Sequence, residues 1–264
     1  MRTLLRIILV LAGTVILVLL AAFCWLHFYL RDLPDVRVLA QFAPTTVTQV
    51  SDPCIGKSTA IPYEAIGVNV TKAISAVETS ESDPGVLRAT WAAFTVGATP
   101  RKQTITASWY ISRTMCYAPS RELHRHLAEL RTAIQLERHY SRRQLFTIYA
   151  NRVSLAPGLI GVQQASAFYF HKKPDELTVP EAALLTGLIR APSVYSPVKH
   201  PDRALRRRNE VIDAMVESGS ITAGDAESYK SAPLGVVTGS NKPLQTEFLS
   251  VPAPTITNAE IRRL

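Results

Sequence analysis

The feature that most constrains this chain is an apolar run near its N-terminus, from Ile7 to Leu26. The run consists almost entirely of Leu, Ile, Val and Ala, interrupted by Gly13, Thr14 and Cys24. At about 1.5 Å of rise per residue, roughly twenty such residues cross a bilayer core of about 30 Å. The sequence therefore predicts one N-terminal transmembrane helix, with the rest of the chain folding beside a membrane.

The flanks of this run indicate its orientation. Arg2 and Arg6 precede it, and positive charge there favours a cytoplasmic N-terminus. The run is longer and bulkier than the apolar core of a cleaved signal peptide, and Phe23 precedes Cys24 where lipid attachment needs a small residue. We therefore predict that residues 1–31 form a cytoplasmic tip and an uncleaved anchor, with the rest on the periplasmic or extracellular side.

Charge and cysteine content narrow the partners of the exported part. The chain has 29 Lys and Arg against 21 Asp and Glu, a net charge of +8. An exported domain rarely meets nucleic acid, so anionic lipid headgroups and phosphate-bearing substrates are the better partners. Cys54 and Cys116 lie where a disulfide persists, so pairing and two free thiols both stay open. No spacing of Cys or His predicts a zinc site.

The chain divides into three stretches after the anchor. Residues 32–60 are punctuated by prolines and are interpreted as a juxtamembrane linker, in which the Val/Thr alternation of 45–50 predicts one strand. Residues 61–234 carry helical patterns and form the main domain. Residues 235–264 are rich in Gly, Ser, Asn and Pro without any period, which predicts a mobile tail.

Helix start signals are clear in the second half of this domain. Capping-box pairs predict helix starts, and Pro and Gly predict where a long helix begins and ends. The pairs are Ser141 with Gln144, Thr178 with Glu181 and Thr222 with Asp225. The helix that starts at Thr178 should end near Arg190. The long helix should begin at Pro201 and be capped by Gly219.

The segment 121–138 is predicted to be an amphipathic helix. Its apolar stripe consists of Leu123, Leu127, Leu130 and Ile134. Arg125 and Glu129 are four residues apart and neighbour each other away from that stripe. By spacing alone they predict only a surface ion pair, worth about 0.2–0.5 kcal/mol.

The same segment opens a series of motifs. Residues 125–137, RHLAELRTAIQLE, resemble the Arg-Lys-x-x-Glu-x-x-x-Ala-x-x-Leu-Glu motif of glycosyltransferase family 51, the peptidoglycan transglycosylases of penicillin-binding proteins and their monofunctional relatives. Residues 141–151 are similar to the family's Tyr-Leu-Asn helix, 158–170 to its Gly-rich turn and Tyr-Phe run, and 181–197 to its last motif. The motifs occur in the family's order, and the resemblance covers roughly residues 60–234.

The resemblance implies a mostly α, lysozyme-like domain with a smaller lobe against the membrane. It implies polymerisation of lipid II into glycan strands, with release of undecaprenyl pyrophosphate, outside the bacterial cytoplasmic (inner) membrane. A divalent cation, Mg²⁺ or Mn²⁺, is an expected companion of the pyrophosphate. No serine-based transpeptidase module follows residue 234, so we expect a separate transpeptidase as a partner.

The resemblance also implies roles for residues. A sugar hydroxyl needs a base to accept its proton, and that base would be Glu78. The guanidinium of Arg125 suits the oxygens of the leaving pyrophosphate. Glu129 would either hold Arg125 in place or help to bind a divalent ion.

Four further residues are candidates for substrate binding. Lys102 and Thr104 lie in the stretch that matches the second motif, and Arg190 lies in the last motif. Asn151 ends the Tyr-Leu-Asn helix and is expected to shape the cleft.

The first two motifs depart from the family pattern. Thr79 replaces the aspartate that follows the catalytic glutamate, while Ala107 and Ser108 replace both glutamines of the second motif. An alternative is therefore a catalytically impaired member that binds lipid II or glycan as a scaffold or regulator of wall synthesis. A glycan-cleaving enzyme is a further alternative, but the motifs from Arg125 onward are those of biosynthetic relatives.

Overall fold

The computed structural model describes residues 2–29, 34–77, 107–115 and 122–237. The described part is mainly helical, as predicted, with two small antiparallel hairpins. The elements before the central helices are α1 (Arg2–Tyr29), η1 (Val36–Phe42), β1 (Thr48–Asp52), β2 (Gly56–Ala60), η2 (Tyr63–Ile66), α2 (Val68–Val77) and α4 (Ala107–Arg113). They are followed by α5 (Glu122–His139), α6 (Arg142–Arg152), β3 (Ser154–Ala156), β4 (Leu159–Ile160), α7 (Gly161–Phe170), η3 (Pro174–Glu176), α8 (Val179–Leu188), α9 (Pro201–Glu217) and α10 (Ala223–Ser231).

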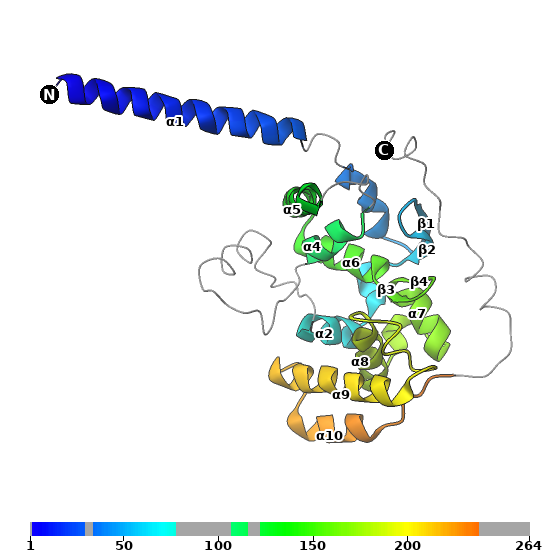
Figure 1. The fold of residues 1–264 in the computed structure, drawn as a ribbon. Coiled ribbons are helices and arrows are strands. Elements are labelled where there is room, and N and C mark those ends of the chain that lie inside the picture. The colour runs from blue at the N-terminus through cyan, green and yellow to red at the C-terminus, as the bar shows by residue number, and fades with distance from the viewer. Residues whose placement is uncertain (1, 30–33, 78–106, 116–121, 238–264) are drawn as a thin grey trace.

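Helix α1 extends away from the packed body of the molecule (Figure 1). Its apolar side chains between Leu11 and Trp25 are exposed. Within the described part of the chain, no helix is long and apolar enough to cross a membrane. The transmembrane helix stays a prediction from the sequence.

The stretch interpreted as a linker is packed from η1 to β2. Leu39 and Phe42 of η1 are fully buried, and β1 pairs with β2 so that Val50 lies opposite Ser58. The strand predicted within 45–50 thus overlaps β1 at residues 48–50, and residues 45–47 precede it. Because these residues contribute to the core, residues 36–60 belong to the domain and do not form a free linker.

A buried ion pair fixes this hairpin to the end of α6. Arg152 Nη1 lies 2.6 Å from Asp52 Oδ2, and both side chains are buried. Burial lowers the pKa of Arg152 and the charge of Asp52 opposes that shift. The other oxygen of Asp52 accepts the backbone N–H of Cys54 at 2.7 Å. Cys54 is disulfide-bonded, and its candidate partner Cys116 lies outside the described residues.

The predicted helix starts are confirmed. Ser141 and Gln144 form the capping box of α6, and Thr178 and Glu181 form that of α8. Helix α9 begins at Pro201 and is capped by Ser218; Gly219 follows in the left-handed region, with φ +71°. The oxygen of the Thr222 side chain accepts the N–H of Asp225 at the start of α10.

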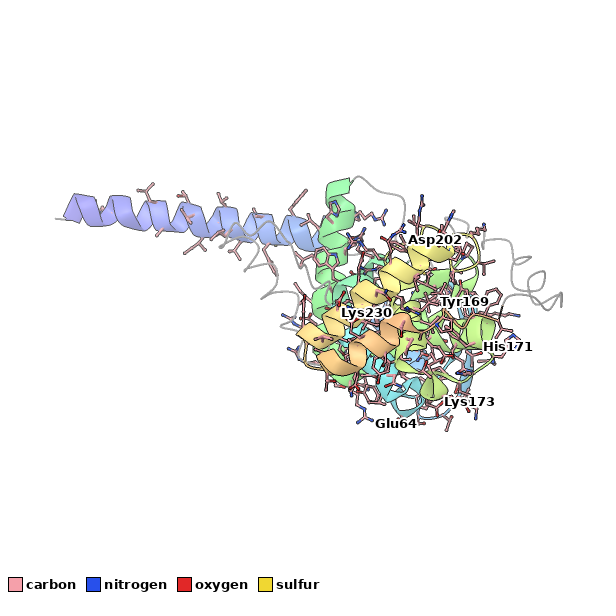
Figure 2. The ribbon with its side chains drawn as sticks, turned by 90° about the horizontal axis from the view of Figure 1, so that it is seen from below. Glu64, Tyr169, His171, Lys173, Asp202 and Lys230 are labelled. Carbon is pink, nitrogen blue, oxygen red and sulfur yellow. The ribbon has the colours of Figure 1, made fainter. Side chains whose placement is uncertain are left out.

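The body has two sides around α6 (Figure 1). On the side nearer α1, helices α4 and α5 pack on each other and η1 packs on α5 and α6. On the other side, α2, α8 and α9 pack together and α10 covers α9. Figure 2 shows Lys230 of α10 beside α9, where its amine lies 2.5 Å from Asp213. One contiguous apolar core runs through both sides.

A buried arginine holds the end of α10. The guanidinium of Arg208, on α9, is fully buried and donates to the backbone carbonyls of Lys230, Ala232 and Pro233. These carbonyls lie at the negative end of the α10 dipole, where a cation is stabilised. Burial lowers the pKa of Arg208.

The chain after α10 returns to α7. The backbone N–H of Val237 donates to the carbonyl of Tyr169 at 2.9 Å, and Leu234 and Val236 pack against the core. Residues 235–237 of the predicted tail therefore lie against the domain.

Candidate active site

The pair formed by Arg125 and Glu129 lies on the first half of α5. Arg125 Nε donates to Glu129 Oε1 at 2.9 Å, and His126 Nδ1 lies 3.7 Å from Glu129 Oε2. The Glu129 side chain is only 3% exposed, whereas that of Arg125 is 55% exposed. A buried carboxylate is costly unless a cation pairs with it. The pair is therefore not the surface ion pair that spacing alone predicts.

The buried face of α5 explains the position of Glu129. Its fully buried residues are Ala128, Glu129, Thr132, Ala133 and Leu136. Leu127, Leu130 and Ile134, members of the predicted apolar stripe, are only half-buried. Three of these five residues are small, Ala128, Thr132 and Ala133, and Glu129 lies among them. Spacing of leucines therefore predicted the wrong face of the helix.

A second carboxylate joins α5 to α4. Ser108 Oγ donates to Glu137 Oε1 at 2.6 Å. Ser108 stands where the family pattern has a glutamine, and Glu137 closes the motif that begins at Arg125. No role was assigned to either residue from the sequence. Their positions in two separate motifs were the signal that could have joined them.

Asn151 is a clamp within the core. Its amide nitrogen donates to the carbonyls of Phe42 at 2.9 Å and Ile61 at 2.8 Å, while its oxygen accepts the N–H of Ile61 at 3.0 Å. Gly161 packs on its backbone with φ +81°, and an added Cβ there would lie 2.8 Å from the Asn151 carbonyl oxygen. Both amide hydrogens of Asn151 are thus used by the fold, and its side chain faces no substrate space.

The remaining predicted residues are not brought to the Arg125–Glu129 pair by the described structure. Arg190 is exposed just after α8, which packs on α2, α7 and α9, whereas α5 packs on α4, η1 and α6. Glu78, Lys102 and Thr104 lie outside the described residues. Glu78 directly follows Val77, the last residue of α2.

The described residues hold no group of three His, Cys, Asp or Glu side chains that could bind a metal ion. Glu129 is a single carboxylate that already pairs with Arg125. This donor set does not fit a divalent cation held by the described residues alone.

Tyr169, in the stretch that matches the Tyr-Phe run, is a core residue. Burial raises the pKa of Tyr169 to about 12, and its ring packs edge-on against Phe168 at 5.0 Å between centroids. Figure 2 shows it near His171 and Lys173, where α7 ends. It stays protonated at neutral pH and supports the fold.

Comparison with known proteins identifies the family of this chain. A family model described as Transglycosylase matches residues 56–216, more than half of the chain. Penicillin-binding protein 1A of Aquifex aeolicus (strain VF5) is 29% identical over 246 residues, covering 88% of this chain and 34% of that protein. Penicillin-binding protein 1A of Escherichia coli (strain K12) is 32% identical over 207 residues, which cover 72% of this chain and 24% of that protein.

Among solved structures, penicillin-binding protein 1A from Haemophilus influenzae is 29% identical over 37% of this chain and 14% of that one, with a TM-score of 0.35. That overlap is too small to bear on the fold. The chain spans about a third or less of the length of these relatives. The residues that match this family model include the Arg125–Glu129 pair and most of the helical domain. The chain belongs to the transglycosylase family, the same family that its motifs resemble.

Proposed function

We propose that this chain is a peptidoglycan glycosyltransferase that polymerises lipid II into glycan strands and releases undecaprenyl pyrophosphate. One observation carries the proposal beyond family membership. Within the motif of α5, a guanidinium that reaches solvent is held by a carboxylate that does not. This arrangement keeps a positive charge at a fixed place, as stabilisation of a leaving anion requires.

Arg125 would stabilise the leaving pyrophosphate. Its Nε is engaged by Glu129, and the described residues offer no hydrogen-bond partner to its two Nη groups. Those groups are free to donate to phosphate oxygens in the fork geometry of a guanidinium. The negative charge on the pyrophosphate grows as the glycosidic bond breaks, so Arg125 stabilises the transition state more than the ground state. Glu129 acts here as a positioning residue.

Glu78 would be the general base. It would accept the proton of the acceptor 4-hydroxyl while that oxygen attacks the anomeric carbon of the donor, with inversion. Helix α2, which ends one residue before Glu78, packs on α8, which ends two residues before Arg190. By the resemblance, Arg190, Lys102 and Thr104 would make further contacts with the substrate.

The proposed setting is the outer face of the bacterial cytoplasmic membrane, with α1 as a single-pass anchor. The support is the apolar run of the sequence and the exposed apolar side chains of α1, which extends from the body (Figure 1). Lipid II carries its prenyl chain in the bilayer, so an anchored enzyme meets its substrate at the headgroups. A separate transpeptidase would cross-link the product.

A divalent cation, Mg²⁺ or Mn²⁺, is proposed as a companion of the pyrophosphate and not as a resident cofactor, since the described residues do not form a site for it. No step above depends on the cation. Its role is tested by measuring polymerisation with and without a chelator.

The proposal is tested by incubating the full chain in detergent with labelled lipid II. We expect polymer from the wild type, none from Glu78→Gln, and a loss of about 10²-fold or more from Arg125→Gln, the scale of losing one donor to a developing anion. Arg203→Gln, an exposed arginine of α9, is the matched control and should leave the rate unchanged. If the wild type binds lipid II and makes no polymer even with a partner transpeptidase added, the chain is a scaffold, as the altered second motif allows.

A further inference from the structure

A group of exposed basic side chains lies where η1 meets the turn between α5 and α6. It consists of Arg37 of η1, Arg138 and His139 at the end of α5, and Arg142 at the start of α6, and is here called the basic rim. None of these four makes an ion pair within the described part of the chain. Arg143, the next residue, differs because it pairs with Glu64 and lies over the ring of Tyr63.

The basic rim is held together by Tyr140. Its hydroxyl donates to the backbone carbonyls of Val36 at 2.8 Å and Arg37 at 3.3 Å, and so fastens η1 to the end of α5. Two acids lie beside them: Asp35, which accepts the N–H of Arg37 at 2.9 Å as the cap of η1, and the half-buried Glu137, which accepts a hydrogen bond from Ser108. The three arginines of the rim outnumber these two carboxylates, so the surface is positive at neutral pH.

The chain length places this surface close to α1. Helix α1 ends at Tyr29 and the description resumes at Pro34, so the five Cα–Cα steps between them span at most about 18 Å. Figure 1 shows α5 at the end of the body that faces α1, whereas α9 and α10 lie at the opposite end. Basic groups within about 8 Å of an anionic bilayer are attracted to it at physiological salt.

We propose that the basic rim docks on anionic phospholipid headgroups beside the anchor. This inference rests on the proposed anchoring by α1. Arg125 lies on the same helix as Arg138, thirteen residues before it. Docking would therefore give the body a second attachment to the bilayer besides α1, and would limit how α5 tilts relative to the headgroups.

The experiment places the full chain in lipid nanodiscs made either of zwitterionic lipid alone or with phosphatidylglycerol added. Amide hydrogen exchange is followed over η1 and the α5–α6 turn, with α9 as the internal reference. We expect slower exchange at the rim in the anionic discs and loss of that difference at high salt. At roughly fivefold per arginine near a surface, Arg138→Ser with Arg142→Ser should weaken docking about 25-fold and abolish the protection.

The matched control is Arg203→Ser with Arg206→Ser, two exposed arginines at the far end of the body, which should keep the protection. Equal exchange of the rim in both kinds of disc, with the chain still disc-bound at high salt, would overturn docking and leave the anchor standing. Release of the chain from the discs by salt would overturn the anchor and the docking that rests on it. Protection that needs added lipid II, and not phosphatidylglycerol, would assign the rim to substrate and overturn the proposal.

Discussion

Arg125 reaches into solvent from a carboxylate that is almost completely shielded from it. The two partners therefore depend on each other unequally. Arg125 can be hydrated without Glu129, but Glu129 without Arg125 would be a buried charge with His126 as its one other ion-pair partner among the described residues. Loss of Arg125 should therefore lower the stability of the fold as well as the rate of turnover.

Replacing Arg125 with Gln is expected to lower the free energy of unfolding by about 1–2 kcal/mol. The cost is below the 3–5 kcal/mol of a fully buried pair because Arg125 is half exposed. The double variant Arg125→Gln with Glu129→Gln should recover much of this loss, because no buried charge is left alone. Denaturant unfolding in detergent measures both, with Arg142→Gln as an exposed control. Equal stability of wild type and Arg125→Gln would refute the dependence.

Glu181 gives a pH-dependent contribution. Burial acts to raise the pKa of Glu181, but hydrogen bonds from Lys172 and Thr178 outweigh it, so that the pKa is lowered from 4.5. A carboxyl whose pKa is lower in the folded state contributes stability above the unfolded pKa and loses it as the pH falls through the folded value. The stability advantage of wild type over Glu181→Gln should therefore be complete above pH 4.5 and shrink below it.

The melting temperature of both proteins as a function of pH measures this effect. Lys172→Met should remove most of the same pH dependence, since its amine lies 2.8 Å from the Glu181 carboxylate. A difference that does not change with pH would mean that Glu181 acts only through its cap of α8.

Among the elements, the β1–β2 hairpin is fastened to α6 by the Asp52–Arg152 pair. Asp52→Asn leaves the guanidinium of Arg152 buried and uncompensated, so we expect a loss of about 3–5 kcal/mol in the free energy of unfolding. Lys57→Gln, an exposed change in β2 of the same hairpin, should cost almost nothing. Denaturant unfolding with and without reductant compares this pair with the disulfide of Cys54. Unchanged stability of Asp52→Asn would show that the hairpin is not fastened through this pair.

Signals that are local in the sequence were the ones that predicted elements correctly. The capping boxes at Ser141 and Thr178 join residues three apart, so the residues that form the sequence pattern are the same residues that form the hydrogen bonds. The clamp of Asn151 and the Asp52–Arg152 pair join residues 90 or more positions apart. No spacing rule reports such contacts, and for that reason the sequence predicts a linker over residues 32–60, although 36–60 are packed against the domain.

The site divides along the same line. The motif resemblance leaves two roles open for Glu129, holding Arg125 or helping to bind a divalent ion, and the structure shows the contact with Arg125. It could not tell that Glu129 is buried, because burial depends on which parts of the folded chain cover that face of α5. The resemblance also assigned Asn151 to the cleft. In the structure, the side-chain amide of Asn151 donates to the backbone carbonyls of Phe42, in η1, and of Ile61, which follows β2.

At the scale of the whole molecule, the last described residues close the body by returning to α7. A chain ending after Val237 keeps the hydrogen bond to Tyr169 and should unfold at the same temperature as the full chain. A chain ending after Pro233 loses that bond and the packing of Leu234 and Val236, so its melting temperature should fall by about 2–4 °C per kcal/mol lost. Calorimetry of the two truncations checks this, and equal melting temperatures would contradict a role for these residues in closing the body.

The clamp of Asn151 also has a consequence for the order in which the chain matures. The carbonyls of Phe42 and Ile61 receive their donor from a residue 109 and 90 positions later. At roughly 5–20 residues per second, a ribosome delivers that donor some 5–20 seconds after Phe42. Until then these carbonyls are hydrogen-bonded to water, and the contact that joins η1 and Ile61 to α6 cannot form before α6 has been made.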